Sequence, residues 1–326
     1  MNSSNTNTSK NTFEKMPIAL AAISLGFMSI STALVDLGIS WLRPIAVLFS
    51  VVCLFLILVK VIKYPKTVRN ELQHPLLGSI YPTIFMTLMV IAVYVVQFSK
   101  PAAQILWLFA IISHFLISAV FFIERFKNFK LIDLIPSWFI PTVGMGVASV
   151  TSKPMALPQV ANIVFYYSLI LFVVVGLLML YRIFAMEKLE GPKRPTLMIM
   201  SAPANICLAS YIAISESPNK ALISALAVVG YITIVWTYLL LPKLIKAKAL
   251  PALAPLTFPL AIGVIACQRY VKYLGKIGSP LQGMLNAFVY VQIVIALVVI
   301  LYVVYKSIAF LIESFSNKEE LKLQSN

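Results

Sequence analysis

The segment Thr257-Phe258-Pro259-Leu260-Ala261 begins one of several apolar stretches, and its proline followed by small and apolar residues is the pattern that decides the fold. The pattern occurs five times. The other copies are Lys15-Met16-Pro17-Ile18-Ala19, Ile80-Tyr81-Pro82-Thr83-Ile84, Phe139-Ile140-Pro141-Thr142-Val143 and Ser201-Ala202-Pro203-Ala204-Asn205. Successive prolines are separated by 65, 59, 62 and 56 residues, which is enough chain for two membrane-spanning helices and their connections. The repeat therefore predicts five helical hairpins.

Composition places these hairpins in a membrane. Of 326 residues, 60% are hydrophobic and only 11% are charged, against about 25% charged residues in a soluble domain. A stretch of about 20 apolar residues is long enough to span a bilayer. Ten such stretches are predicted near residues 17–36, 44–63, 78–97, 101–123, 136–152, 159–182, 195–214, 221–241, 253–272 and 283–305. This composition excludes a soluble enzyme and predicts an all-α integral membrane protein.

The odd-numbered and even-numbered stretches differ in composition. Windows of 20 residues contain 31 Gly, Ser, Thr, Pro and Asn residues in the five odd stretches and 11 in the five even ones. Small residues let helices approach closely, and a proline leaves a backbone carbonyl that lipid cannot satisfy. We therefore predict a quasi-fivefold inner ring of proline-kinked odd helices around a central pore, with the kinks at Pro17, Pro82, Pro141, Pro203 and Pro259. The even helices form an outer ring that faces lipid.

The basic residues predict the orientation of the chain. Nineteen of the 26 Lys and Arg residues fall in the two ends of the chain and in the links after the even stretches. Cytoplasmic segments carry such an excess, so both termini are expected to be cytoplasmic in a multi-pass protein of the plasma membrane. We predict a polar tail at 1–16, one transmembrane pore domain at 17–306 and a second tail at 307–326. The net charge of +15 is spread over short links, which favours contact with anionic lipid and argues against a nucleic-acid partner.

The predicted membrane interior lacks chemistry for catalysis. All eleven acidic residues fall outside or at the ends of the stretches, and Arg269 lies near the end of the ninth. His114 is the one group placed to carry a proton, and a lone His on an apolar helix is more often a packed residue. No metal-ligand or catalytic cluster is visible, and Cys53, Cys207 and Cys267 are expected to be buried core residues. We therefore predict neither an enzyme nor a cofactor. An uncharged pore would favour large, weakly hydrated ions.

Three stretches resemble the tellurite-resistance/dicarboxylate transporter family, which includes bacterial TehA and the plant slow anion channels. They are Met16-Pro17-Ile18-Ala19-Leu20, Ala202-Pro203-Ala204 and Leu256-Thr257-Phe258-Pro259-Leu260. The resemblance implies ten helices with quasi-fivefold symmetry, a homotrimer with one pore in each subunit, and Phe258 as a gate whose ring lies across the pore. It also implies passive conduction of small inorganic or organic anions.

Alternatives remain open at this point. The same family implies export of C4-dicarboxylates such as malate, or of oxyanions such as tellurite. A metabolite carrier built from two inverted halves and working by alternating access is a further alternative. One departure from the family pattern is Lys15, which occupies the approach to Pro17 and is expected to attract anions at the mouth.

Overall fold

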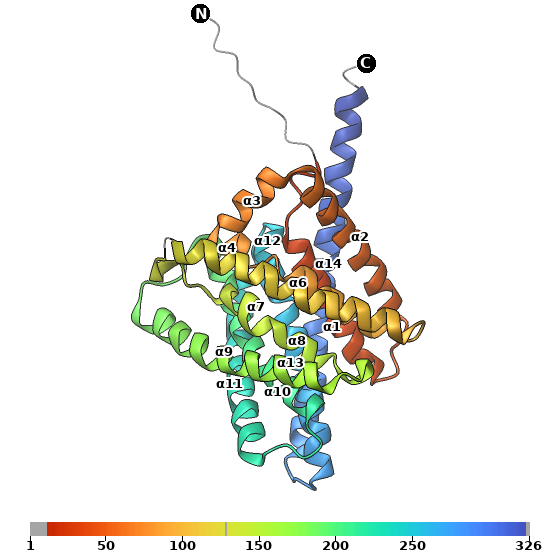
Figure 1. Ribbon diagram of the computed structural model, residues 1–326, viewed down its shortest axis with the longest axis vertical. Helices are drawn as coiled ribbons and strands as arrows, with labels where there is room; N and C mark the ends of the chain where they lie inside the picture. The colour runs from red at the N-terminus through yellow and green to blue at the C-terminus, as the bar shows by residue number, and fades with distance from the viewer. Residues whose placement is uncertain (1–11, 128, 324–326) are drawn as a thin grey trace, which may run out of the picture.

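A computed structural model describes residues 12–127 and 129–323 of the protein (Figure 1). Within these residues every regular element is an α-helix or a 3₁₀ helix. Eight segments are helices long and apolar enough to cross a membrane. The class predicted from composition, an all-helical protein with several membrane-spanning helices, is therefore confirmed.

All ten predicted stretches are helical, but the odd ones are built from pieces. Helix α1 (Ala19–Val35) is a single helix of 17 residues, whereas three of the other odd stretches combine a leading element with a longer helix. The third stretch combines α4 (Pro75–Gly78) with α5 (Thr83–Val95). The seventh combines η5 (Gly191–Ser201) with α10 (Ala202–Ile214). The ninth combines α12 (Leu250–Leu253) and η6 (Ala254–Leu256) with α13 (Phe258–Lys276).

The fifth stretch is broken further and does not form one long helix. It is divided into η2 (Pro136–Trp138), α7 (Phe139–Thr142), η3 (Val143–Gly146) and α8 (Val147–Val150). Two prolines remove backbone donors here, and Gly144 and Gly146 lower the helix propensity of the residues that follow. The breaks therefore coincide with the residues least suited to a continuous helix.

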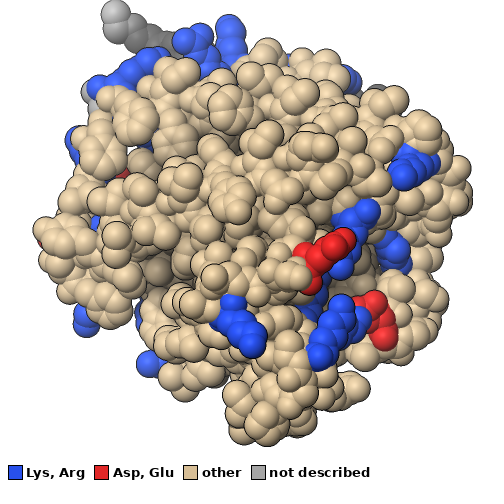
Figure 2. All heavy atoms as spheres, turned by 60° about the horizontal axis from the view of Figure 1, so that its bottom comes forward, with Lys and Arg blue, Asp and Glu red and all other residues tan. Residues whose placement is uncertain are grey.

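The even stretches form long, unbroken helices. They are α2 (Leu42–Lys63), α6 (Lys100–Lys127), α9 (Pro158–Ala185), α11 (Lys220–Leu244) and α14 (Gln282–Leu323), with the shorter elements α3 (Pro65–Gln73), η1 (Leu131–Asp133) and η4 (Lys153–Met155) in the links. Only 22% of the most apolar part of α9 is buried, against 78% for the segment Leu250–Lys276. Figure 2 shows a face of the molecule that is mostly free of charged side chains. These helices therefore present an apolar surface of the kind that lipid covers.

The odd segments contact one another in a closed series. Helix α1 packs against α5 and α13, α13 packs against α10, α10 packs against α8, and α8 packs against α5. The even helices pack on the outside of this series: α2 mainly on α1, α6 mainly on α5, α9 on α8 and α10, α11 on α10 and α13, and α14 on α13 and α1. The small residues counted in the odd stretches therefore lie where helices meet.

The first and last parts of the described chain lie at one end of the molecule. The Thr12 hydroxyl donates to the Ser314 carbonyl at 3.3 Å, and the Phe13 ring lies 5.7 Å from that of Phe315. We call this end, with the links after α2, α6, α9 and α11, the basic end. The Lys193 ammonium joins two of those links through an ion pair with Asp133 at 3.7 Å.

Buried cysteine, histidine and lysine side chains lie inside the bundle. Cys53, Cys207 and Cys267 are free thiols and buried, as predicted. His114 is also buried, and its Nδ1 lies 3.5 Å from the Ser118 hydroxyl. Lys60 is one of the nineteen basic residues that the sequence analysis assigned to the links and chain ends. The structure places it, buried, in the last turn of α2. Its ammonium donates to Glu71 at 2.6 Å and to the Met16 carbonyl at 2.8 Å.

Candidate functional site

A cavity of about 520 Å³ opens at the basic end. Its walls come from α1, α5, α7, α10 and α13 and from the links that contain residues 76–80, 191–199 and 247–255. Lys248 is the only charged side chain among its described lining residues, and Thr83, Ser137 and Thr196 supply hydroxyl groups. We call this space the wide cavity.

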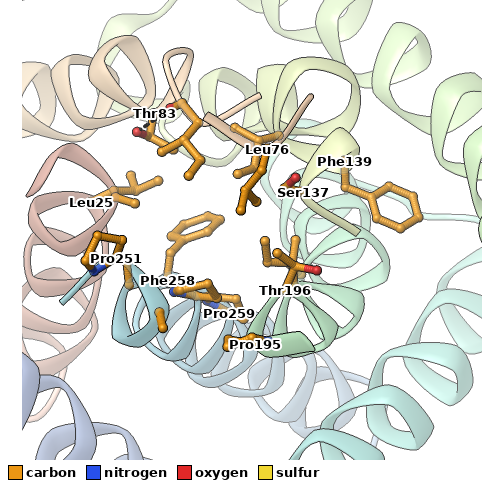
Figure 3. Close-up of a pocket in the computed structure, with 18 of the residues that line it drawn as sticks. Leu25, Leu76, Thr83, Ser137, Phe139, Pro195, Thr196, Pro251, Phe258 and Pro259 are labelled. Carbon is orange, nitrogen blue, oxygen red and sulfur yellow. Dashed lines mark hydrogen bonds between the residues drawn. The ribbon is translucent and has the colours of Figure 1, made fainter. Parts of the chain in front are cut away.

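The Phe258 ring projects into the wide cavity. Figure 3 shows it in the centre of the opening, surrounded by Leu25, Leu76, Thr196 and Pro251, whereas the Phe139 ring points away from it. Phe258 is 8% exposed, so the ring is packed on most sides.

A second cavity, of about 170 Å³, lies beyond Phe258. We call it the narrow cavity. Phe258 is the one residue, among those described, that lines both spaces. From it, Ile262, Ile265 and Arg269 continue along α13 on the narrow cavity. These positions follow the spacing of one helix face, so the two cavities lie in line along α13 with the ring between them.

Two other helices extend along both cavities in the same way. On α1, Leu25 lines the wide cavity and Thr32 and Asp36 line the narrow one. On α5, Met86 lines the wide cavity and Val90 the narrow one. The two spaces therefore share three walls and differ in the residues that those walls present.

Contacts with α1 fix the backbone that carries Phe258. The chain changes from η6 to α13 at Thr257, whose hydroxyl donates to the Ala254 carbonyl at 2.8 Å and lies 3.2 Å from the Ala22 carbonyl. Gly26 allows this approach. A Cβ atom at Gly26 would lie 2.4 Å from the Thr257 Cβ and 2.8 Å from the Phe258 backbone nitrogen. Sequence reasoning missed this contact because its partners are more than 230 residues apart.

Three helices begin at the wide cavity. The first residues of α5, α10 and α13 are Thr83, Ala202 and Phe258, and all three line it. Helix N-termini attract anions where backbone N–H groups lack partners. Here several of these groups donate to the preceding turn: Thr83 to the Ile80 carbonyl at 2.9 Å, Ile84 to the Tyr81 carbonyl at 3.1 Å, and Ala202 to the Ile199 carbonyl. The wide cavity thus combines apolar walls with one charged side chain among its described lining residues, the ammonium group of Lys248.

Charged side chains line the narrow cavity, which corrects the expectation of an uncharged passage. Arg269 lines it together with Lys153 and Asp36. Arg269 was placed near the end of an apolar stretch, but α13 continues to Lys276, so the residue lies two helical turns inside. Arg269 follows Phe258 by eleven residues, about three helical turns, so both side chains lie on the same face of α13. This spacing is the sequence signal that could have placed Arg269 on the same cavity as Phe258.

The predicted proline positions are distributed unevenly around these spaces. Pro203 and Pro259 lie in the first turns of their helices and line the wide cavity. Pro82 immediately precedes α5 and Pro141 lies within α7, and neither lines a cavity described above. Pro17 precedes α1 and lies, with exposed Lys15, in an adjacent recess of about 290 Å³ that shares Leu77, Ile80 and Pro251 with the wide cavity.

The fold defines a helical membrane protein, and its two cavities meet at one aromatic ring, that of Phe258. Residues 15–308 match the family model SLAC1, described as voltage-dependent anion channel. The chain belongs to this family. The resemblance seen in the sequence is thereby confirmed.

Two proteins of Methanocaldococcus jannaschii, each named an uncharacterized transporter, are similar to parts of the chain. One is 29% identical over 121 residues, covering 36% of this chain and 35% of its own length. The other is 24% identical over 154 residues, covering 44% of each chain. The matched segments therefore span less than half of these relatives.

Proposed function

We propose that the protein is a passive anion channel or uniporter in which small, weakly hydrated monovalent anions such as chloride and nitrate pass from one cavity to the other when the Phe258 ring moves aside. The observation that carries this proposal is that Phe258 alone, among the described residues, lines both cavities. Membership of an anion-channel family supports it as well.

Electrostatics and hydration favour anions of this kind. The wide cavity has one cation, Lys248, and no acidic residue among its described lining residues, so its side-chain charge favours anions. Its apolar side chains replace little of an ion's hydration shell, which favours ions that lose water at low cost.

We further propose an arrangement for the whole passage. The closed series of contacts among the odd segments supports an inner ring around it, completed by five outer helices. The shared location of Thr12 and Ser314 supports an even number of spans, and the excess of basic residues supports cytoplasmic termini at the plasma membrane. The homotrimer with one pore in each subunit is proposed from the family resemblance.

Recordings from the purified protein in planar bilayers test the gate. Phe258→Ala is expected to raise the anion current at least about fivefold, which corresponds to a barrier lower by ~1 kcal/mol. Phe258→Leu keeps a bulky side chain and should raise it less. Leu76→Ala is the matched control, because it enlarges the wide cavity without removing the ring.

The same recordings separate the proposal from its alternatives. Under bi-ionic conditions, thiocyanate and nitrate should pass more readily than chloride. An unchanged current in Phe258→Ala, or a preference for chloride, would contradict the gate or the hydration argument respectively. Currents carried by malate or tellurite in place of chloride would favour an exporter of those anions, and saturable exchange without a current would favour an alternating-access carrier.

A further inference from the structure

Arg269 is held by backbone carbonyls, one of the ways in which cations are accommodated in membrane proteins. Its two terminal nitrogens donate to backbone carbonyls, Nη1 to Ala209 at 2.8 Å and Nη2 to Val150 at 2.9 Å. Val150 is the last residue of α8, where carbonyl groups lack helical partners. The guanidinium therefore joins α13 to α8 and α10, and it is fixed at the wall of the narrow cavity.

No carboxylate within ion-pair distance neutralises Arg269 among the described residues. The one acidic residue that lines the narrow cavity, Asp36, pairs with Lys272 at 2.6 Å. Lys153 adds a second, exposed cation on the same cavity. The bonds to neutral carbonyls leave the positive charge of Arg269 in place, so the charged groups of this cavity sum to an excess of positive charge.

Two threonine hydroxyls on the narrow cavity already donate hydrogen bonds to backbone carbonyls. The Thr32 hydroxyl donates to the Met28 carbonyl at 2.9 Å, and the Thr151 hydroxyl donates to the Val147 carbonyl at 2.8 Å. A guanidinium has five N–H donors, of which two are used here. Arg269 therefore has more N–H groups left to offer an anion than these hydroxyls do.

We propose that Arg269 sets the charge selectivity of the passage by holding a small monovalent anion in the narrow cavity, on the far side of Phe258 from the wide cavity. This inference rests on the proposed function and adds a second site to it. The eleven residues between Phe258 and Arg269 correspond to about 16 Å along α13, so an anion that passes the ring arrives next at the guanidinium. A guanidinium is weakly hydrated itself, which suits anions that have lost water in the wide cavity.

The test measures selectivity separately from conductance. In the Phe258→Ala background, reversal potentials in a KCl gradient give the ratio of chloride to potassium permeability. Arg269→Gln removes the charge and keeps a donor for one carbonyl, and it is expected to lower this ratio about tenfold. Arg269→Lys keeps the charge and should retain most of the ratio. A residue needed only for packing would change the amount of folded protein or the current and leave the ratio unchanged.

Two exposed neighbours provide variants that leave the bonds of Arg269 intact. Asp36→Asn should raise the permeability ratio and Lys153→Gln should lower it, both by less than Arg269→Gln and mainly at low salt, because exposed charges are screened. If Arg269→Gln does not fold, unchanged ratios in both of these variants overturn the inference. If Arg269→Gln folds and its chloride-to-potassium permeability ratio is unchanged, the inference about Arg269 is also overturned. The proposed function would still stand in that case, provided that the Phe258→Ala background carries an anion current. Absence of anion current in the wild type and in Phe258→Ala overturns both.

Discussion

The two cavities on either side of Phe258 share three helices but offer an ion different surroundings. The wide cavity is about three times larger, its walls are apolar, and Lys248 is the one charged side chain among its described lining residues. The narrow cavity is lined by Arg269, Lys153 and Asp36. The same α13 supplies the ring, then apolar residues, then a guanidinium. Under the proposed function, one face of α13 would therefore separate the step that dehydrates an ion from the step that recognises its charge.

The largest expected effect concerns block by a bulky anion. A naphthalenesulfonate added on the side of the wide cavity should inhibit a single channel at a concentration at least about tenfold lower than when it is added on the other side. Burying about 60 Å² of its apolar surface in the wide cavity contributes ~1.5 kcal/mol. The cavity volumes of about 520 Å³ and 170 Å³ give the reason for the difference. Single-channel recordings with the blocker added to each side in turn measure it.

Methanesulfonate serves as the control for this measurement, because it carries the same charged group without the large apolar surface. It should act from both sides at similar concentrations. Equal block by naphthalenesulfonate from both sides would show that the two cavities do not differ in the way their linings indicate.

A smaller effect is expected at the point where the two cavities meet. Gly26→Ala places a methyl group 2.4 Å from the Thr257 Cβ, so either α1 or the backbone beside Phe258 must move. Overpacking of this kind costs about 1–3 kcal/mol, and we expect a lower thermal unfolding temperature together with an altered current. Thermal unfolding and bilayer recordings of the same preparation measure the two effects.

Gly176→Ala is the matched control. A Cβ atom at Gly176, on the outer helix α9, would meet only the Phe172 ring at 4.0 Å. This change should leave the current unaltered and keep or raise stability, since alanine favours a helix over glycine. If both glycine variants behave alike, the close contact between Gly26 and Thr257 does not position the ring.

Patterns that repeat along the chain made the fold class predictable. The prolines from Pro17 to Pro259 recur every 56 to 65 residues, a period set by the length of two helices that cross the bilayer. The low number of charges reflects the apolar interior of the bilayer. Together they identify a helical membrane protein of several spans. The division into small-residue and bulky stretches anticipated which helices are buried, such as the segment Leu250–Lys276. The breaks in residues 136–150 were harder to foresee, because proline and glycine mark a weak point without fixing where each short helix ends.

The site was predictable only in part. Phe258 was selected through a family resemblance, since composition does not distinguish one phenylalanine among twenty. Arg269 was overlooked because a hydropathy reading assigns basic residues to the flanks of a span, and the carbonyls of Ala209 and Val150 that hold it come from distant segments. The contact of Gly26 with Thr257 is likewise tertiary. Residues whose role depends on such long-range contacts are not identified by local pattern.

The smallest expected effect lies at the mouth of the wide cavity. His74 Nδ1 accepts hydrogen bonds from the backbone N–H groups of Leu76 and Leu77 at 3.2 and 3.3 Å, and both leucines line that cavity. This cap needs the neutral imidazole. Partial burial, followed by the positive charges of Arg125 and Lys193, lowers the pKa of His74 from its ordinary value of 6.5, while Asp133 opposes the shift. The native state therefore binds a proton less readily than the unfolded chain does.

The sign of the pH effect follows from that lowered pKa. The contribution of His74 to stability is complete above the unfolded value of 6.5 and is lost as the pH falls through the lower pKa of the folded protein. His74→Ala should cost about 1 kcal/mol at neutral pH, whereas His74→Asn keeps a capping side chain and should cost less. Between about pH 7.5 and about pH 5, the unfolding temperature of the wild type should fall more than that of His74→Asn. Equal falls would mean that the His74 cap does not respond to protonation. His74 does not line the narrow cavity, so the chloride-to-potassium permeability ratio should stay constant in both variants. A constant ratio would show that the cap at the mouth affects stability without affecting charge selectivity.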